Sequence, residues 1–184
     1  MAGVAGAVVL LVGTSGCATE PAPAPTASAS NSPTPAAPVF ASDEEALAAA
    51  TEAYANYLAT YDAFWAGQAQ KSEYLELTTG SALASEESNL TQFESEGWKP
   101  VGTSSFDSIT LQSLSQSDSG EWEVRTYLCI DVSKGDVVDS QGMSVAKPDR
   151  PLRLPLEVAF VTPSPTSSDL KISESQVWSG NNFC

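Results

Sequence analysis

Residues 121–132 read EWEVRTYLCIDV, a stretch in which apolar and polar side chains alternate. One face collects Trp122, Val124, Leu128, Ile130 and Val132, and the other collects Glu123, Arg125, Tyr127, Cys129 and Asp131. A period of two residues is typical of a β-strand that buries one face against a core. The stretch therefore predicts a long strand, and it places Cys129 on the face that points away from the core.

The segments on both sides of this strand continue the pattern and predict an antiparallel meander. Further strands are expected at residues 106–114, 152–160 and 170–178, with one hairpin turn at 117–120 and a second around 139–142. Both turn segments are rich in Ser, Asp and Gly, which are residues that turns favour. Pro155 has no backbone N–H to donate, so we expect it at a sheet edge or at a bulge.

Upstream of residue 98 the pattern is helical. Ser42 and Glu45 form a capping box that opens a helix over residues 43–66, in which apolar and aromatic side chains recur every three or four positions. A short helix is expected over 71–77 and a third helix over 81–96, with Gly80 and Gly97 as stops. Helices first and antiparallel strands afterwards predict an α+β fold.

The central strand and the residues after it also carry a family resemblance. The run YLCIDVS at 127–133, then Asp139, Gly142 and Arg150, and the closing VWSG at 177–180 with FC at 183–184, resemble uncharacterised lipoproteins of actinobacteria, the high-GC Gram-positive bacteria. The resemblance covers most of residues 101–184. It implies a nuclear transport factor 2-like cone, in which three N-terminal helices pack on a bent antiparallel sheet, and it implies no activity.

The N-terminal region differs in composition from the rest of the chain. Residues 4–12 form an apolar stretch of signal-peptide length, too short to span a bilayer, and TSGC at 14–17 resembles a bacterial lipobox. Residues 1–17 are therefore expected to be a lipoprotein signal peptide whose Cys17 carries the lipid, with an ordinary secretory signal as the alternative. Residues 18–38 predict a disordered tether rich in Pro, Ala, Ser and Thr, and residues 39–184 predict one globular domain.

This N-terminal pattern predicts the location of the protein and the state of its cysteines. We expect the protein at the outer face of the cytoplasmic membrane, anchored through Cys17, or secreted if Cys17 carries no lipid. Thiols oxidise outside the cytoplasm, and with Cys17 joined to lipid, Cys129 and Cys184 remain as a pair. A disulfide between them would hold the chain's end on the outer side of the sheet.

The composition excludes several classes of function. The chain has 23 acidic and 8 basic residues, for a net charge of −15, and such a surface repels phosphate backbones, so nucleic acid is not an expected partner. The chain has no histidine, which removes Ser-His-Asp and Cys-His catalysis and any His-ligated metal site. No motif indicates a cofactor or a metal.

The leading functional hypothesis is a non-catalytic envelope module that binds a small ligand or another envelope protein. Its cavity would lie between helices and sheet and be lined by Tyr57, Tyr61 and Trp65, although such an aromatic stripe also suits a helix that simply packs on a sheet. On the third predicted helix, Glu86 and Glu87 are expected to be solvated, because that helix face is polar.

Two alternatives stay open. The first is an isomerase or hydratase of small molecules that uses a cavity Asp and a Tyr, with Asp107 or Asp131 as the carboxylate. The second is a structural or assembly role, in which the outer face of the sheet pairs with a second copy as a homodimer. A closed apolar cavity with one buried carboxylate would favour the enzyme, an open cavity the binding module, and a filled core the structural role.

Overall fold

The computed structural model describes residues 38–184. The predicted signal peptide with Cys17, and the predicted tether up to residue 37, lie outside the described residues. Three helices come first, namely α1 (Asp43–Trp65), α2 (Lys71–Leu75) and α3 (Gly80–Glu96). Six strands follow, namely β1 (Lys99–Gly102), β2 (Ser105–Gln116), β3 (Trp122–Asp131), β4 (Gly135–Val138), β5 (Arg153–Val161) and β6 (Lys171–Val177). This order confirms the predicted α+β fold.

Local signals explain where the first helix begins. The Ser42 side chain accepts a hydrogen bond from the backbone N–H of Glu45 (3.3 Å), and the Glu45 carboxylate accepts one from the N–H of Ala41 (2.7 Å). These bonds satisfy N–H groups that have no partner within the helix. Among the helices of residues 38–184, none is both long enough and apolar enough to cross a membrane.

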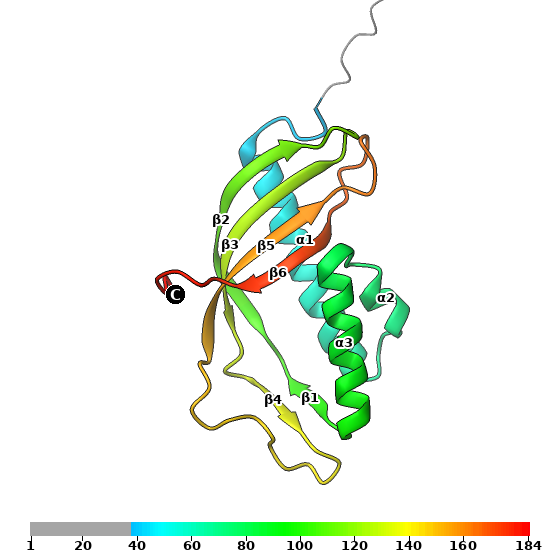
Figure 1. The fold of residues 1–184 in the computed structure, drawn as a ribbon, viewed down its shortest axis with the longest axis vertical. Coiled ribbons are helices and arrows are strands. Elements are labelled where there is room, and N and C mark those ends of the chain that lie inside the picture. The colour runs from blue at the N-terminus through cyan, green and yellow to red at the C-terminus, as the bar shows by residue number, and fades with distance from the viewer. Residues whose placement is uncertain (1–37) are drawn as a thin grey trace, which may run out of the picture. The chain divides into compact units, whose positions relative to one another are not determined.

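The strands form two antiparallel sheets (Figure 1). The larger sheet has the order β2-β3-β5-β6, and the strand predicted at 121–132 is β3, in its interior. The smaller sheet pairs β1 with β4, from Lys99 opposite Val138 to Gly102 opposite Gly135. β1 is not predicted from the sequence, because its four residues show no alternation. The expected turn at 139–142 is present, and a single bridge between Val138 and Ser144 closes it.

The core lies between α1 and one face of the larger sheet. Figure 1 shows α1 crossing that sheet. The buried residues of this layer are Ala46, Ala50, Tyr54 and Leu58 from α1, Val124 and Leu128 from β3, and Leu156, Val158 and Phe160 from β5. The α1 residues recur at every fourth position and form one stripe. The Tyr54 ring packs edge-on against Phe106, with ring centroids 4.9 Å apart. Side chains therefore fill the space between this part of α1 and the sheet.

Pro155 lies in an interior strand, but its local surroundings are those of an edge. β6 ends at Val177, opposite Leu156, so the ladder stops just before Pro155. The Pro155 carbonyl accepts a hydrogen bond from the N–H of Trp178 (2.9 Å). In an antiparallel strand the N and C=O of one residue face the same neighbouring strand, so the Pro155 nitrogen faces the side of β6. Because β6 ends before it reaches Pro155, no ladder hydrogen bond requires an N–H at this position. β5 is thus an interior strand, but at Pro155 it has no β6 residue opposite it and is locally an edge.

The outer face of the sheet carries the predicted disulfide. Cys129 and Cys184 are joined, with their Cα atoms 5.6 Å apart. The rings of Trp178 and Phe183 pack on Tyr127 of β3, with centroids 5.1 and 5.8 Å from the Tyr127 ring. The last residues are thereby held on the outer side, as the alternation in β3 predicts. Pairing of this face with a second copy stays a prediction.

Candidate functional site

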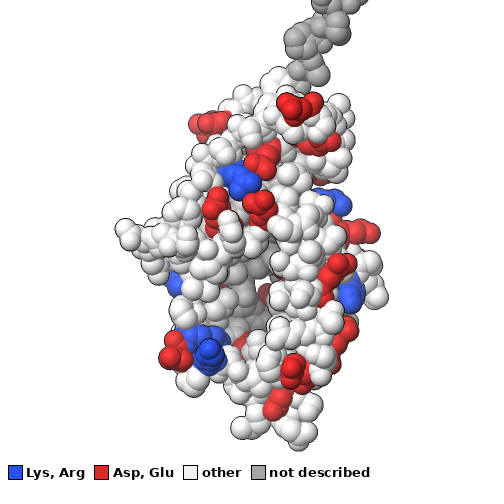
Figure 2. Space-filling model, in the orientation of Figure 1, with Lys and Arg blue, Asp and Glu red and all other residues white. Residues whose placement is uncertain are grey.

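A cavity of about 250 Å³ lies between the end of α1 and the β1–β4 pair. Its lining residues come from α1, from β1 and the residues after it, from β4 and from the loop that precedes β5: Tyr61, Asp62, Trp65, Pro100, Val101, Gly102, Thr103, Ser104, Val132, Gly135, Asp136, Val137, Ala146 and Arg150. Figure 2 shows a hollow in this face of the molecule, between the strands and α3. The walls are mostly apolar, which is usual for a site that holds a small organic molecule.

A single glycine allows the chain to build this wall. Gly102 has φ +82°, and a Cβ there would overlap the backbone carbonyl oxygen of Lys134. The next residue, Thr103, donates its N–H to that same oxygen at 3.3 Å. Only glycine combines the left-handed backbone with such a close approach. The position of β1 against β4, and with it one side of the cavity, therefore depends on Gly102.

Asp62 places a carboxylate in the cavity. Burial raises the pKa of Asp62 above its ordinary value, and the backbone N–H of Ser104 partly offsets that rise. No Lys or Arg within residues 38–184 forms an ion pair with this carboxylate. A partly buried carboxylate without a cationic partner is costly for the fold, and such groups gather at functional sites.

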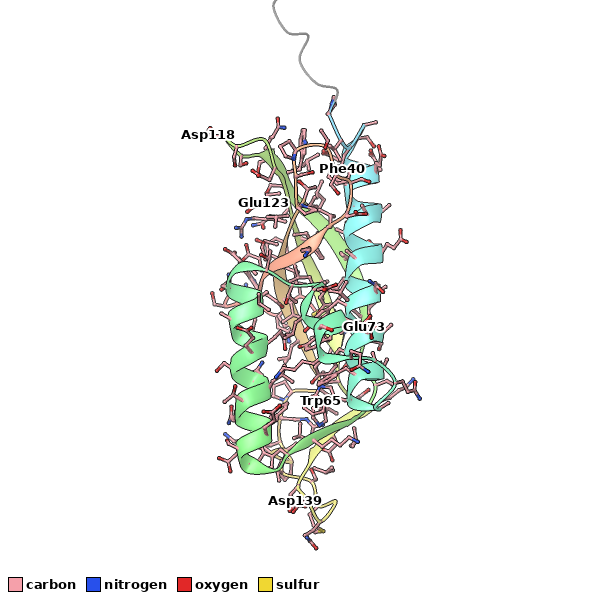
Figure 3. All side chains as sticks on the ribbon, turned by 90° about the vertical axis from the view of Figure 1, so that its right-hand side faces the viewer. Phe40, Trp65, Glu73, Asp118, Glu123 and Asp139 are labelled. Carbon is pink, nitrogen blue, oxygen red and sulfur yellow. A yellow bond between two sulfur atoms is a disulfide. The ribbon has the colours of Figure 1, made fainter. Side chains whose placement is uncertain are left out.

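Tyr61 and Trp65 supply the aromatic part of the wall. Their rings meet edge to face, with centroids 6.3 Å apart, and Trp65 also packs against Phe93 of α3 at 5.7 Å. Figure 3 shows Trp65 in the space between α3 and the end of α1. The indole Nε1–H is buried and has no hydrogen-bond partner among the described residues.

Arg150 and Asp136 lie on the opposite wall. The Arg150 guanidinium donates to the backbone carbonyl of Gly135 (2.7 Å) and lies 3.9 Å from Asp136 Oδ1. With Asp62, the lining thus carries two carboxylates and one guanidinium, a net charge of −1. Within residues 38–184, no group of His, Cys, Asp and Glu side chains is arranged to hold a metal ion.

A second polar cluster lies beside the cavity and corrects one prediction. The Glu86 carboxylate accepts hydrogen bonds from the hydroxyls of Tyr57 (2.5 Å) and Tyr74. The expectation that Glu86 is solvated is therefore wrong, whereas Glu87 is exposed. Burial, and then the Glu86 charge, raise the pKa of both tyrosines well above the ordinary range, so both hydroxyls stay protonated donors.

The structure separates the three aromatic residues that are predicted together as cavity lining. Tyr61 and Trp65 line the cavity, while Tyr57 lies one helical turn earlier and holds Glu86. Asp62 is a site residue that is not predicted from the sequence. The signal that could have found it is the segment YDAFW at 61–65, in which one carboxylate is surrounded by aromatic residues on a helix that buries its aromatic face.

The two carboxylates of the enzyme alternative lie outside the cavity lining. Asp107 is bound by the Arg153 guanidinium through two contacts of 2.5 Å, and hydrogen bonds from Arg153 lower its pKa to about 2. Hydrogen bonds from Ser133 lower the pKa of Asp131. A general base needs contact with its substrate and a pKa near the working pH. Neither residue meets these conditions, so the structure does not support them in that role.

Replacing Arg153 with glutamine is expected to raise the Asp107 pKa from about 2 toward the value of about 3.9 in model peptides. Because the folded-state pKa is lowered, the stabilisation is present above the ordinary Asp value and is lost as the pH falls toward 2. An NMR titration of the Asp107 carboxyl carbon measures this change. Arg150→Gln is the matched control, since Arg150 does not contact Asp107, and an unchanged Asp107 titration in Arg153→Gln would contradict the ion pair.

Comparisons with known proteins give weak likenesses only. Comparison with protein-family models and with curated proteins yields no match. Among solved structures, the intermembrane space region of the chloroplast protein ARC6 matches with 14% identity and a TM-score of 0.46, over 71% of this chain and 95% of that one. A periplasmic fragment of TraM matches with 16% identity and a TM-score of 0.44, over 75% and 98%. Aln2 from a Streptomyces species matches with 16% identity and a TM-score of 0.37, over 75% and 92%. These scores do not identify a family.

Proposed function

We propose that the protein is a lipid-anchored module of the cell envelope that binds a small ligand in the cavity between α1 and the β1–β4 pair. The observation that carries the proposal is the cavity itself, an apolar space of about 250 Å³ that contains the Asp62 carboxylate. Apolar clefts with a few polar groups are the usual form of small-molecule sites. The cavity is open to solvent, since the lining includes the exposed residues Val101, Gly102 and Thr103, and an open cavity favours binding over a closed reaction chamber.

The proposed location and fold family rest mainly on the sequence. The lipobox-like residues 14–17 support a lipid on Cys17, and the Pro-rich residues 18–38 support a tether between the membrane and the domain. A nuclear transport factor 2-like cone is supported by three helices that precede an antiparallel meander and by a cavity between helix and strands. The proposed location at the outer face of the cytoplasmic membrane would give the protein access to molecules outside the cell.

A second candidate function is an isomerase or hydratase, and one observation favours it. Asp62 and Tyr61 line the same cavity, and burial raises the pKa of both groups. The enzyme alternative requires an Asp and a Tyr in one cavity. Asp62 and Tyr61 meet this requirement, whereas Asp107 and Asp131 lie outside the lining. The test is to recover the bound molecule and add it back to the purified protein. Conversion to a product would support the enzyme, and unchanged release would support simple binding.

Filling the cavity is expected to remove the ligand without unfolding the protein. Ala146 lines the cavity at its partly exposed side, so Ala146→Phe would occupy the space with a ring while leaving α1 and the sheet core untouched. Native mass spectrometry of protein purified from its own host should show a bound small molecule in the wild type and none in Ala146→Phe. Ala84→Phe, on the exposed face of α3, is the control and should keep the adduct. Equal adducts in all three proteins would place the ligand elsewhere.

A further inference from the structure

We infer that the ligand of this cavity is a small organic cation, an amine with an apolar body of about one ring. The inference rests on the proposed function, because it takes the cavity as the binding site. It concerns the charge and size of the ligand, which the binding proposal leaves open.

The charges of the lining favour a cation. Asp62 forms no ion pair with a Lys or Arg among residues 38–184. Burial raises its pKa, and the backbone N–H of Ser104 offsets that rise only in part. The single guanidinium, Arg150, is already held by the Gly135 carbonyl and lies beside Asp136. A bound monocation would therefore bring the lining from a net charge of −1 to neutrality.

The aromatic wall adds to this preference. Tyr61 and Trp65 come from the same helix as Asp62 and line the same cavity, so a ligand ammonium near Asp62 would have aromatic side chains beside it. The electron-rich face of an aromatic ring attracts a cation within about 6 Å of its centre. Because the Trp65 Nε1–H is buried, the indole offers no donor for an anionic group.

Other ligand classes fit the lining less well. An anion would meet two carboxylates and one guanidinium that is already bonded, and a neutral ligand would further desolvate the Asp62 charge without pairing it. A divalent metal ion such as Ca²⁺ needs about six to eight oxygen ligands, and residues 38–184 contain no such cluster. The acidic chain, with a net charge of −15, also raises the local concentration of cations.

The size of the cavity limits the apolar body. Sites for drug-sized ligands enclose about 300–1,000 Å³, and this cavity encloses about 250 Å³. A single aromatic ring with a short amine chain suits such a space. Phenethylamine, 2-phenylethanol and phenylacetate share one body and differ in charge, so they form a matched set of cationic, neutral and anionic probes.

The test is the affinity of these three probes for the purified full-length protein, measured by ligand-observed NMR titration. We expect phenethylamine to bind at least tenfold more tightly than 2-phenylethanol, and phenylacetate to bind most weakly. In Asp62→Asn, phenethylamine should lose this advantage while 2-phenylethanol binds as before. Glu87→Gln removes an equal charge from an exposed position on α3 and should leave the preference intact.

The outcomes separate the two proposals. If all three probes bind to Ala146→Phe as tightly as to the wild type, the cavity is not the binding site and both proposals fail. If none of the three probes binds to the wild type, the proposed ligand class is wrong, and native mass spectrometry of the wild type and Ala146→Phe decides whether the cavity holds a different ligand. If the probes bind in the cavity but phenethylamine has no advantage, or keeps its advantage in Asp62→Asn, binding stands and the preference for a cation through Asp62 is wrong. The ranking in the wild type already tests the charge preference if Asp62→Asn does not fold.

Discussion

Replacing Cys129 and Cys184 together with alanine is expected to lower the free energy of unfolding by about 4 kcal/mol. The disulfide joins residues separated by 55 positions. In the chain-entropy model, closing a loop of that length lowers the conformational entropy of the unfolded chain, and this raises the free energy of unfolding by about 4 kcal/mol. Urea unfolding of the wild type and of Cys129→Ala/Cys184→Ala measures the difference. The outer layer in which Tyr127, Trp178 and Phe183 pack should loosen at the same time.

The controls separate the crosslink from simple loss of packing. Cys129 is fully buried, so alanine there also removes a sulfur from a packed site. Wild-type protein unfolded under reducing conditions lacks only the crosslink, and it should lose most of the roughly 4 kcal/mol. Two thiols that react in the native protein, or equal urea midpoints with and without reductant, would contradict the prediction.

The elements that the sequence predicts well are those whose signal is local. The alternation at 121–132 predicts β3 and also the outward position of Cys129, because side-chain direction in a strand follows from a period of two. The start of α1 is equally local, since Ser42 and Glu45 contact the backbone within four positions. Such contacts need no knowledge of the rest of the fold.

The elements that the sequence does not predict depend on distant partners. β1 is a strand because residues 99–102 lie opposite 135–138, and its own four residues carry no pattern. Pro155 behaves as an edge residue because β6 ends opposite its neighbour. The cavity depends on this same pairing, so Asp62 and Arg150 become a site only after β1 and β4 are placed. A helical periodicity predicts which face of α1 is buried, but not where the buried layer ends and a cavity begins.

Glu86 is the strongest example of a role that only the fold assigns. It stands 29 positions from Tyr57 and 12 from Tyr74, among polar residues of α3. Its neighbour Glu87 has the same side chain and the same local sequence, but it points to solvent. The difference arises because α2 and α3 bring Tyr74 and Glu86 against the aromatic end of α1, where the Tyr57 and Tyr74 rings lie 5.8 Å apart.

Glu86→Ala is therefore expected to lower the free energy of unfolding by about 3 kcal/mol, because it leaves the Tyr57 and Tyr74 hydroxyls buried without an acceptor. Glu87→Ala is the matched control, and an exposed substitution of this kind should change stability by no more than about 0.5 kcal/mol. Urea unfolding of both variants measures the contrast.

A triple variant tests the cause of that loss. Tyr57→Phe and Tyr74→Phe combined with Glu86→Leu remove the acceptor and both donors together, so no polar group is left unpaired. Replacing all hydrogen-bond partners by apolar groups of similar shape is often nearly neutral, and most of the stability lost in Glu86→Ala should return. If Glu86→Ala costs no more than Glu87→Ala, or if the triple variant is the least stable of the set, the carboxylate does not hold the two tyrosines. The junction of α1, α2 and α3 would then depend on aromatic packing alone.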